Sequence, residues 1–202
     1  MSLSVFALNC TLKPSPTDSS CELLLRQALG AFAERGAYGE LLRAVDFNIK
    51  PGVSSDEGDG DDWPRLRSKI LAADIFLLGT PIWLGHPSSI CQRVLERLDA
   101  LLGETDDVGR MLSYGTVAGV AVVGNEDGAH HVSAQIFQGL NDLGFSLAPN
   151  AVTYWVGEAM QGTDYKDLPQ PPEKVAQTTQ TLARNSIHLA RLLKASQYPG
   201  EA

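Results

Sequence analysis

Short apolar runs alternate with longer segments of helical period along the chain, and this alternation is the feature that most constrains the fold. The apolar runs fall at residues 3–8, 41–46, 74–79, 116–123 and 150–156. Strands of a parallel sheet, buried on both faces, have this near-continuous apolar character, and the crossovers between them need helices. The pattern therefore predicts an α/β fold, a doubly wound five-stranded parallel sheet with helices on both faces.

Five helices are expected between and after these strands. In the segments that separate the strands, apolar side chains recur every three or four residues, as they do on one face of a helix. The expected helices cover residues 20–36, 64–72, 88–102, 132–143 and 172–195, and the last is a closing helix after a Pro-rich connector. A length of 202 residues suits one domain, so we expect a single domain over 1–202 with its core at about 3–157.

The charge balance restricts the class of partner. The chain has 16 Lys and Arg and 24 Asp and Glu, which gives a net charge of -8. This negative charge argues against nucleic acid or an anionic membrane surface as the partner. The longest apolar stretch, residues 75–85, is interrupted by Thr80 and Pro81 and is too short to span a membrane. No basic residue precedes Lys13, so no secretory signal is expected, and we expect a cytoplasmic protein.

Most of this net charge lies in one short segment. Five acids fall within residues 56–62, and without them 19 acids would face 16 bases, a balance of -3. The segment is also rich in glycine, which predicts a long solvated loop. Three scattered cysteines are too few for a disulfide framework or a Cys-x-x-Cys metal site, so we expect reduced thiols and no metal at Cys10, Cys21 and Cys91.

The loop after the first strand, residues 9–20, carries five hydroxyls and one lysine before a helix begins. Hydroxyl groups and backbone N–H groups at a helix N-terminus can bind a phosphate monoester. The loop has no glycine, so it is neither a Walker loop nor a dinucleotide fingerprint. A polar turn with a serine N-cap is an equally weighted alternative. The candidate phosphate ligands are Thr11, Lys13, Ser19 and Ser20.

The loop after the third strand, residues 80–89, contains an aromatic residue, a glycine and two prolines. Its prolines restrict the backbone and its glycine permits close approach, so the loop could hold a flat ring against main-chain N–H groups. The alternative is that the tryptophan only covers the core. The candidate ring-binding residues are Pro81, Ile82, Trp83, Leu84 and Gly85.

The loop after the fourth strand, residues 124–131, completes the set, because the carboxyl ends of parallel strands meet at one edge of the sheet. Its candidate ligand residues are Gly124, Asn125, Glu126 and Gly128. Glu126 and Asp127 could instead cap the next helix. His130 and His131 point about 100° apart on a helix, which does not suit a two-His metal site. We expect a solvated His130 and a half-buried His131 in preference to a catalytic pair.

Four short motifs together resemble the flavodoxin-like NAD(P)H-dependent FMN reductase and quinone reductase superfamily, especially its multimeric branch. They are T-L-K at 11–13, S-S at 19–20, T-P-I-W-L-G at 80–85 and E-R-L at 96–98. The resemblance covers roughly residues 3–157, and the motif at 80–85 is its most specific part. Lys13 stands where the family often has Arg, and Gln92 stands where many relatives have Lys.

This resemblance implies an FMN cofactor, NADPH or NADH as electron donor, and a quinone, flavin or similar acceptor. The FMN phosphate would lie on Thr11, Lys13, Ser19 and Ser20, with the ring on residues 81–85 and the loop at 124–128. Hydride transfer needs no protein nucleophile, so no catalytic acid or base is predicted. Glu126 and Asp127 beside the ring would disfavour a negatively charged reduced flavin.

The resemblance also implies a homodimer or homotetramer, with the flavin near a subunit boundary. Tyr154, Trp155 and Tyr165 could supply an aromatic contact there, although core packing is expected for Trp155. A flavodoxin-type electron carrier is the main alternative function, and a flavin-free flavodoxin-like interaction scaffold is the second. A serine hydrolase is disfavoured because the chain has no Gly-x-Ser-x-Gly motif.

Overall fold

Five parallel strands form the central sheet in the order β2-β1-β3-β5-β6 in the computed structural model, which describes residues 2–159 and 161–200. They are β1 (Leu3–Asn9), β2 (Ala37–Arg43), β3 (Ile75–Trp83), β5 (Val117–Gly124) and β6 (Ser146–Val156). The predicted five-stranded parallel sheet is confirmed. A sixth strand that was not predicted, β4 (His86–Pro87), pairs antiparallel with the end of β3.

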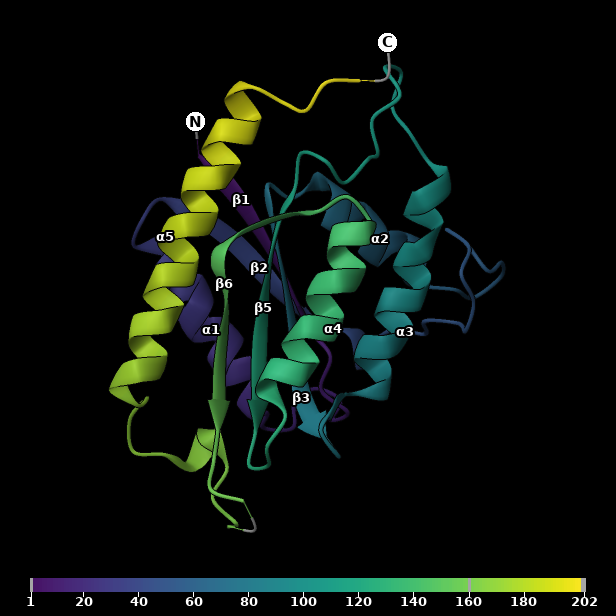
Figure 1. Cartoon of the computed structure of the whole chain (residues 1–202). Helices are drawn as coiled ribbons and strands as arrows, with labels where there is room; N and C mark the ends of the chain where they lie inside the picture. The colour runs from purple at the N-terminus through teal and green to yellow at the C-terminus, as the bar shows by residue number, and fades with distance from the viewer. Residues whose placement is uncertain (1, 160, 201–202) are drawn as a thin grey trace.

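Helices cover both faces of the sheet, as predicted (Figure 1). One face carries α1 (Ser20–Ala33) and α5 (Glu173–Ala195), and the other carries α2 (Trp63–Ala72), α3 (Ser89–Leu98) and α4 (Ala129–Asp142). Alternate residues of each strand point to opposite faces. In β1, Val5 and Ala7 belong to the core under α1 and α5, whereas Phe6 and Leu8 belong to the other core.

Two strands run through prolines that were expected to lie outside them. β3 was predicted to stop before Thr80 and Pro81, but it continues to Trp83. Its pairing with β1 ends at Gly79, so from Thr80 onward one side of β3 is an edge, where a proline costs no ladder hydrogen bond. β6 begins four residues before the predicted start and contains Pro149, which an edge strand likewise tolerates.

Two further boundaries differ from the prediction. β2 begins at Ala37, directly after a turn at Gly36, and ends at Arg43, so the expected strand at 41–46 is displaced. Residues 44–46 instead form the short 3-10 helix η1 (Ala44–Asp46). The helix expected over residues 88–102 ends as an α-helix at Leu98 and continues as η2 (Asp99–Gly103). Terminal turns of helices often tighten in this way.

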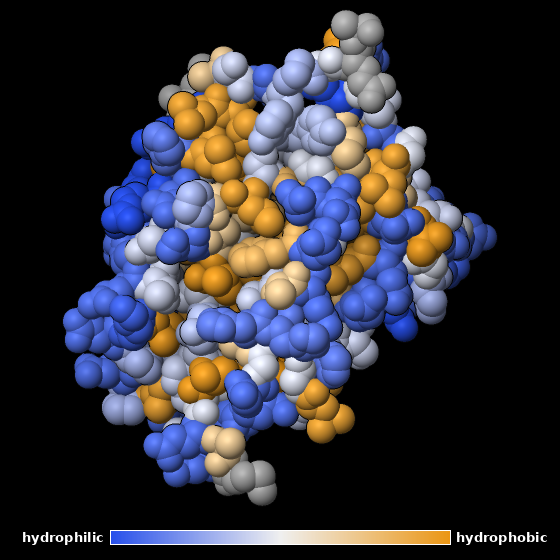
Figure 2. All heavy atoms as spheres, in the orientation of Figure 1, coloured by the Kyte–Doolittle hydropathy of each residue, from blue (hydrophilic) through white to orange (hydrophobic). Residues whose placement is uncertain are grey.

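The face of the molecule that carries β6 is partly apolar. Figure 2 shows hydrophobic side chains gathered in the middle of this face, between α5 and α4, with hydrophilic side chains around them. Partly buried residues of β6, among them Leu147, Val152 and Tyr154, pack against the core here. Within residues 2–159 and 161–200, no helix combines the length and the apolar character that crossing a membrane requires.

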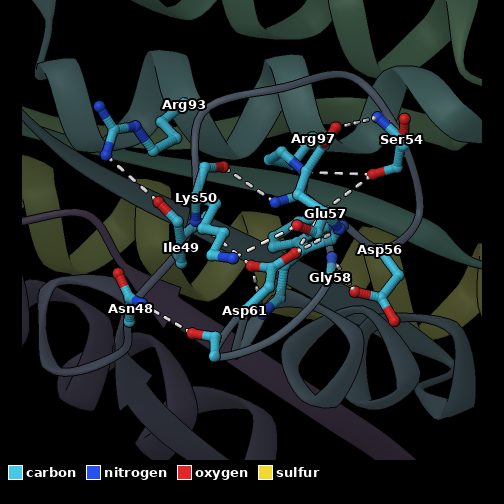
Figure 3. A network of polar contacts seen from close by, with 12 residues as sticks. Asn48, Ile49, Lys50, Ser54, Asp56, Glu57, Gly58, Asp61, Arg93 and Arg97 are labelled. Atoms are coloured by element: carbon cyan, nitrogen blue, oxygen red, sulfur yellow. Dashed lines mark hydrogen bonds and ion pairs between the residues drawn. The ribbon is translucent and has the colours of Figure 1, made fainter.

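The acidic segment at 56–62 is not the fully solvated loop that was expected. The side chains of Asp61 and Arg97 are both 0% exposed, and Arg97 Nη2 lies 2.8 Å from Asp61 Oδ2 (Figure 3). Arg97 also donates to the carbonyl oxygens of Lys50 and Ser54 at 2.9 Å. A buried ion pair is stable only when its remaining hydrogen-bonding groups are satisfied, and this pair meets that condition. Arg97, in α3, therefore anchors the loop to the core.

Backbone groups of the loop complete the network around Asp61. Its carboxylate accepts hydrogen bonds from the N–H groups of Lys50, Glu57 and Trp63 at 3.2, 2.9 and 3.2 Å. Burial alone would raise the pKa of Asp61, but the Arg97 guanidinium and these N–H groups hold the pKa well below its ordinary value. The aspartate is therefore ionised throughout the physiological pH range.

We expect Asp61→Asn to lower the free energy of unfolding by about 3–5 kcal/mol, because it leaves the buried Arg97 charge without its counter-ion. Urea denaturation measures the loss. Asp59→Asn, at an exposed position on the same loop, is the matched control and should change stability by no more than about 0.5 kcal/mol. Equal losses in the two variants would contradict a specific role for the buried pair.

The pH dependence of this difference provides a second test. Because the folded-state pKa of Asp61 is depressed, its stabilisation is complete above the ordinary aspartate pKa of about 4 and is lost as the pH falls below it. The stability difference between the wild type and Asp61→Asn should stay constant from neutral pH to about pH 4 and shrink at lower pH.

Candidate functional site

The loops after β1, β3 and β5 meet at the carboxyl ends of the strands, the lower end of the sheet in Figure 1. They border a cleft of about 660 Å³, counted to its open mouth. Ten of the thirteen predicted ligand residues line this cleft: Thr11, Lys13, Ser19, Ser20, Pro81, Ile82, Trp83, Gly124, Asn125 and Glu126. The topology of a doubly wound sheet therefore brings three loops that are distant in sequence into one site.

Three hydroxyl groups at one end of the cleft act as hydrogen-bond acceptors within the protein. Thr11 Oγ1 accepts from the N–H of Lys13 at 3.3 Å, and Ser19 Oγ accepts from the N–H of Glu22 at 3.2 Å as the N-cap of α1. Ser20 Oγ accepts from the N–H of Lys166 at 3.2 Å. Each hydroxyl therefore keeps its own proton to donate. With Lys13 and the positive end of α1, these donors suit an acceptor-only dianion such as a phosphate monoester.

A buried arginine beneath this loop was not foreseen from the sequence. Arg43, the last residue of β2, is 6% exposed and donates from Nη1 to the carbonyl oxygens of Lys13 and Pro14 at 3.1 and 3.0 Å. Its Nε donates to Glu22 at 2.6 Å. Arg43 thus binds two carbonyls of the first loop with a charged donor, which fixes the backbone of this loop.

The carboxylate of Glu22, in the first turn of α1, is neutralised by two arginines. Arg26 and Arg43 each donate to it, and both contacts are shorter than 2.9 Å. Burial would raise the pKa of Glu22, but these hydrogen bonds outweigh burial and lower it. The acid therefore stays ionised and paired, and its charge does not oppose an anion at the start of α1.

The turn after β3 presents an aromatic ring and is tied to the loop after β5. Trp83 lines the cleft and is 53% exposed, so it does not cover the core. The next residue, Leu84, has a φ of 51°, and its N–H donates to Glu126 Oε1 at 2.9 Å. Glu126 therefore stabilises the left-handed conformation of Leu84 in the turn after Trp83. From the sequence, Glu126 was expected to cap a helix or to lie beside a bound ring, and this contact was not predicted.

Three predicted ligand residues lie outside the cleft lining. Leu84 is 89% exposed at the tip of the turn, whereas Gly85 and Gly128 pack against each other. A Cβ at Gly128, where φ is 122°, would lie 2.8 Å from the Cα of Gly85. These two glycines let the loops approach closely, so they shape the site and do not line it.

The aromatic residues near the site also differ from expectation. His131 is exposed, not half-buried, and its ring lies edge-on to His86 at 5.2 Å. His130 is exposed as expected, and its Nε2 lies 3.1 Å from the hydroxyl of Tyr154. Trp155 is partly buried and packs against the core, as expected, and it also lines the cleft with its ring 5.4 Å from the Tyr165 ring.

Six cleft residues were not identified as ligands from the sequence: Leu12, Cys21, Val123, Trp155, Asp164 and Tyr165. Asp164 and Tyr165 belong to the connector after β6, where the sequence has no motif to mark them. Cys21 is buried at the start of α1, and burial raises the pKa of its thiol. A neutral thiol is a poor nucleophile, so this cysteine contributes packing to the cleft.

Comparison with known proteins gives a consistent family relationship. A family model described as NADPH-dependent FMN reductase matches residues 3–160. The 8-demethyl-8-aminoriboflavin-5'-phosphate synthase of Streptomyces davaonensis is 33% identical over 210 residues, which cover 98% of this chain and 81% of that protein. A protein of Mycobacterium bovis named divalent metal cation transporter MntH is 36% identical over 200 residues, 96% of this chain. The chain spans only 29% of that relative's length.

Solved structures show the same similarity. The crystal structure of RosB with bound 8-demethyl-8-formylriboflavin-5'-phosphate superposes with a TM-score of 0.88 at 33% identity, covering 98% of this chain and 82% of that one. A flavone reductase superposes with a TM-score of 0.69 at 15% identity, covering 99% of this chain and 67% of that one. The second similarity shows a shared fold alone.

We expect Arg43→Met to weaken binding of riboflavin 5'-phosphate about tenfold or more, because the loop carbonyls lose a charged donor. Binding of riboflavin, which lacks the phosphate, should change little. Fluorescence titration of both ligands measures the difference. Arg26→Met is the matched control, since Arg26 also pairs with Glu22 but makes no contact with the loop carbonyls. Equal losses for both ligands would show that Arg43 does not act through the phosphate loop.

Proposed function

This chain belongs to the NADPH-dependent FMN reductase family, and from that premise we propose that it binds FMN in the cleft and passes electrons from NADPH or NADH to a quinone, flavin or similar small acceptor. The observation that carries the proposal is the combination of chemistries that line the cleft. Hydroxyl donors, Lys13 and the start of α1 line it together with Trp83, Trp155 and apolar side chains. A phosphorylated flat ring system has the complementary chemistry.

The residues of the first loop would bind the phosphate. Thr11, Ser19 and Ser20 each keep a proton to donate, and Lys13 adds an exposed positive charge. Lysine is a point charge without the bidentate fork of arginine, so the hydroxyl groups would supply most of the geometric selectivity. Arg43 would hold the loop in its binding conformation from below.

The second and third loops would position the ring. Pro81 to Trp83 form the end of β3, and Gly124 ends β5 with Asn125 and Glu126 directly after it. Bound FMN would supply the hydride chemistry that links a reduced nicotinamide to a two-electron acceptor. The protein contributes position and partial exclusion of water, so we assign no side chain the role of catalytic acid or base.

Rapid kinetics separates the proposed reductase from a flavodoxin-type electron carrier and from a flavin-free scaffold. We expect the purified chain to bind FMN and its flavin absorbance to bleach within seconds when mixed anaerobically with NADPH or NADH in a stopped-flow instrument. Slow bleaching with tight FMN binding would favour the carrier. The absence of any fluorescence change on addition of FMN would refute a flavin function.

Glu126 gives a test of the electrostatics at the ring. Glu126→Gln keeps an acceptor for the N–H of Leu84 but removes the negative charge, so we expect the two-electron midpoint potential of bound FMN to rise by on the order of 20 mV, which corresponds to about 1 kcal/mol. Dye-equilibration titration measures the potential. Asp127→Asn, at an exposed neighbouring position, should change it less. An unchanged potential in Glu126→Gln would rule out the charge effect.

A second candidate function is chemical modification of a flavin phosphate. It is favoured by 33% identity to a protein named 8-demethyl-8-aminoriboflavin-5'-phosphate synthase, which covers 98% of this chain. In that case the cleft residues would hold the flavin phosphate as a substrate. Mass spectrometry of the flavin recovered after aerobic incubation with amine donors distinguishes the two functions, since a reductase returns FMN of unchanged mass.

We also propose that the chain acts as a homodimer or homotetramer. Trp83 and Leu84 at the mouth of the cleft are 53% and 89% exposed, which leaves apolar surface beside the proposed flavin site. A second copy could cover it. Tyr154, Trp155 and Tyr165 are less suited to an intersubunit contact than expected, because Tyr165 is buried and Trp155 packs against it.

A further inference from the structure

Asp164 and Tyr165, from the connector between β6 and α5, form a fourth wall of the cleft, and both lie beyond the residues 3–160 that match the family model. This wall is held at both ends. Near its start the N–H of Gly157 donates to the carbonyl oxygen of Gly124 at 2.9 Å. Near its end the Tyr165 hydroxyl donates to Gln27 at 2.6 Å, and the N–H of Lys166 donates to Ser20 at 3.2 Å.

Close packing also fixes the start of the connector. A Cβ at Gly157 would lie 2.7 Å from the Trp155 ring and 3.2 Å from the Cβ of Asn125. A side chain at this position would therefore have to displace the Trp155 ring, which favours glycine here. The η3 helix (Tyr165–Asp167) places the Tyr165 ring 5.4 Å from the Trp155 ring. Asp164 and Tyr165 are thus held beside the cleft, which limits the entropy lost when they bind a ligand.

One pair of polar residues that bond to each other lines the cleft at this wall. Asn125 and Asp164 both line it, and Asn125 Nδ2 donates to Asp164 Oδ1 at 3.3 Å and to the carbonyl oxygen of Gln161 at 3.4 Å. These two acceptors define which way the amide points, because the opposite orientation would set oxygen against oxygen. Asn125 Oδ1 is therefore an acceptor, and the carboxyl group of Asp164 adds further acceptor oxygens.

We infer that Asn125 and Asp164 together select a ring-borne amide or imide N–H group on the ligand. The inference rests on the proposed function, since that function supplies two such groups. One is the imide N–H of the flavin ring system, and the other is the carboxamide of the nicotinamide donor. An analogue without the N–H would leave acceptor oxygens unpaired in a partly dry cleft, and sites built to bind a donor reject such analogues strongly.

The three strand-end loops supply only one member of this pair, and the connector supplies the other. Asn125 follows β5, but Asp164 comes from a segment some forty residues later, and neither residue completes the acceptor set without the other. Asp164 therefore acts as a specificity-determining residue toward the ligand's donor group, while the phosphate loop and the Trp83 turn provide affinity that does not depend on it.

The test compares Asp164→Ala with Asp167→Ala, a control in the same connector whose carboxylate is 52% exposed and pairs with Lys166. Two matched ligand pairs are used. FMN and N3-methyl-FMN are titrated by fluorescence, and NADPH and its reduced 3-acetylpyridine analogue are compared by anaerobic reduction of the FMN-saturated protein. Thermal unfolding of both variants establishes that they are folded.

We expect the wild type and Asp167→Ala to prefer the N–H-bearing member of one pair by tenfold or more, and Asp164→Ala to reduce that preference to threefold or less. Loss of the preference for FMN over N3-methyl-FMN identifies the flavin imide as the donor. Loss of the preference for NADPH over the acetylpyridine analogue, with FMN affinity unchanged, identifies the carboxamide. Both results support the inference.

The inference is overturned if Asp164→Ala leaves both preferences at their wild-type values, whatever happens to overall affinity. A uniform loss of affinity for all four ligands would likewise overturn it, because a purely structural role for the connector produces that pattern. These outcomes leave the proposed function standing when wild-type FMN binding and reduction are intact. A wild-type chain that binds neither flavin would overturn both.

Discussion

The parallel pairing of β3 with β1 on one side and β5 on the other is the constraint on which the site depends. It brings the carboxyl ends of these strands to one edge, with Asn9 opposite Gly79 and Thr80 opposite Val122. Past this edge the backbone leaves the ladder, so its polar groups must find other partners. The loops that follow are therefore organised by side-chain hydrogen bonds, and those bonds give the cleft its shape.

Each loop is held by a polar side chain from elsewhere in the chain. Ser88, the N-cap of α3, donates to the carbonyl oxygen of Cys10 at 2.6 Å and joins the first loop to the second. Glu126 joins the third loop to the second through the N–H of Leu84, and Arg43 holds the first loop from β2. The candidate ligand groups are thus carried on loops that hydrogen bonds hold together, which limits the conformational entropy lost on binding.

The network around Asp61 and Arg97 shows that a run of acidic residues in the sequence does not establish that all of them are exposed to solvent. Most of the net charge of -8 falls at residues 56–62, and a run of acids is usually a solvated surface. One of those acids instead enters the core, where it meets an arginine from α3 whose guanidinium also lies over the Trp63 ring at 5.7 Å. The acidic segment at 56–62 therefore contains a residue that anchors the loop to the core as well as residues on a charged surface.

Local pattern in the sequence was sufficient for the fold class, the order of elements and the three loops that meet at the strand ends, because apolar periodicity reports directly which faces are buried. It also narrowed the first helix cap to Ser19 or Ser20, since a cap contact spans only three residues, and the structure selects Ser19. Tertiary structure alone decided the roles of Arg43, Arg97 and Asp164. Their partners lie between 21 and 47 residues away in the chain, and only the folded sheet brings such distant groups within hydrogen-bonding distance.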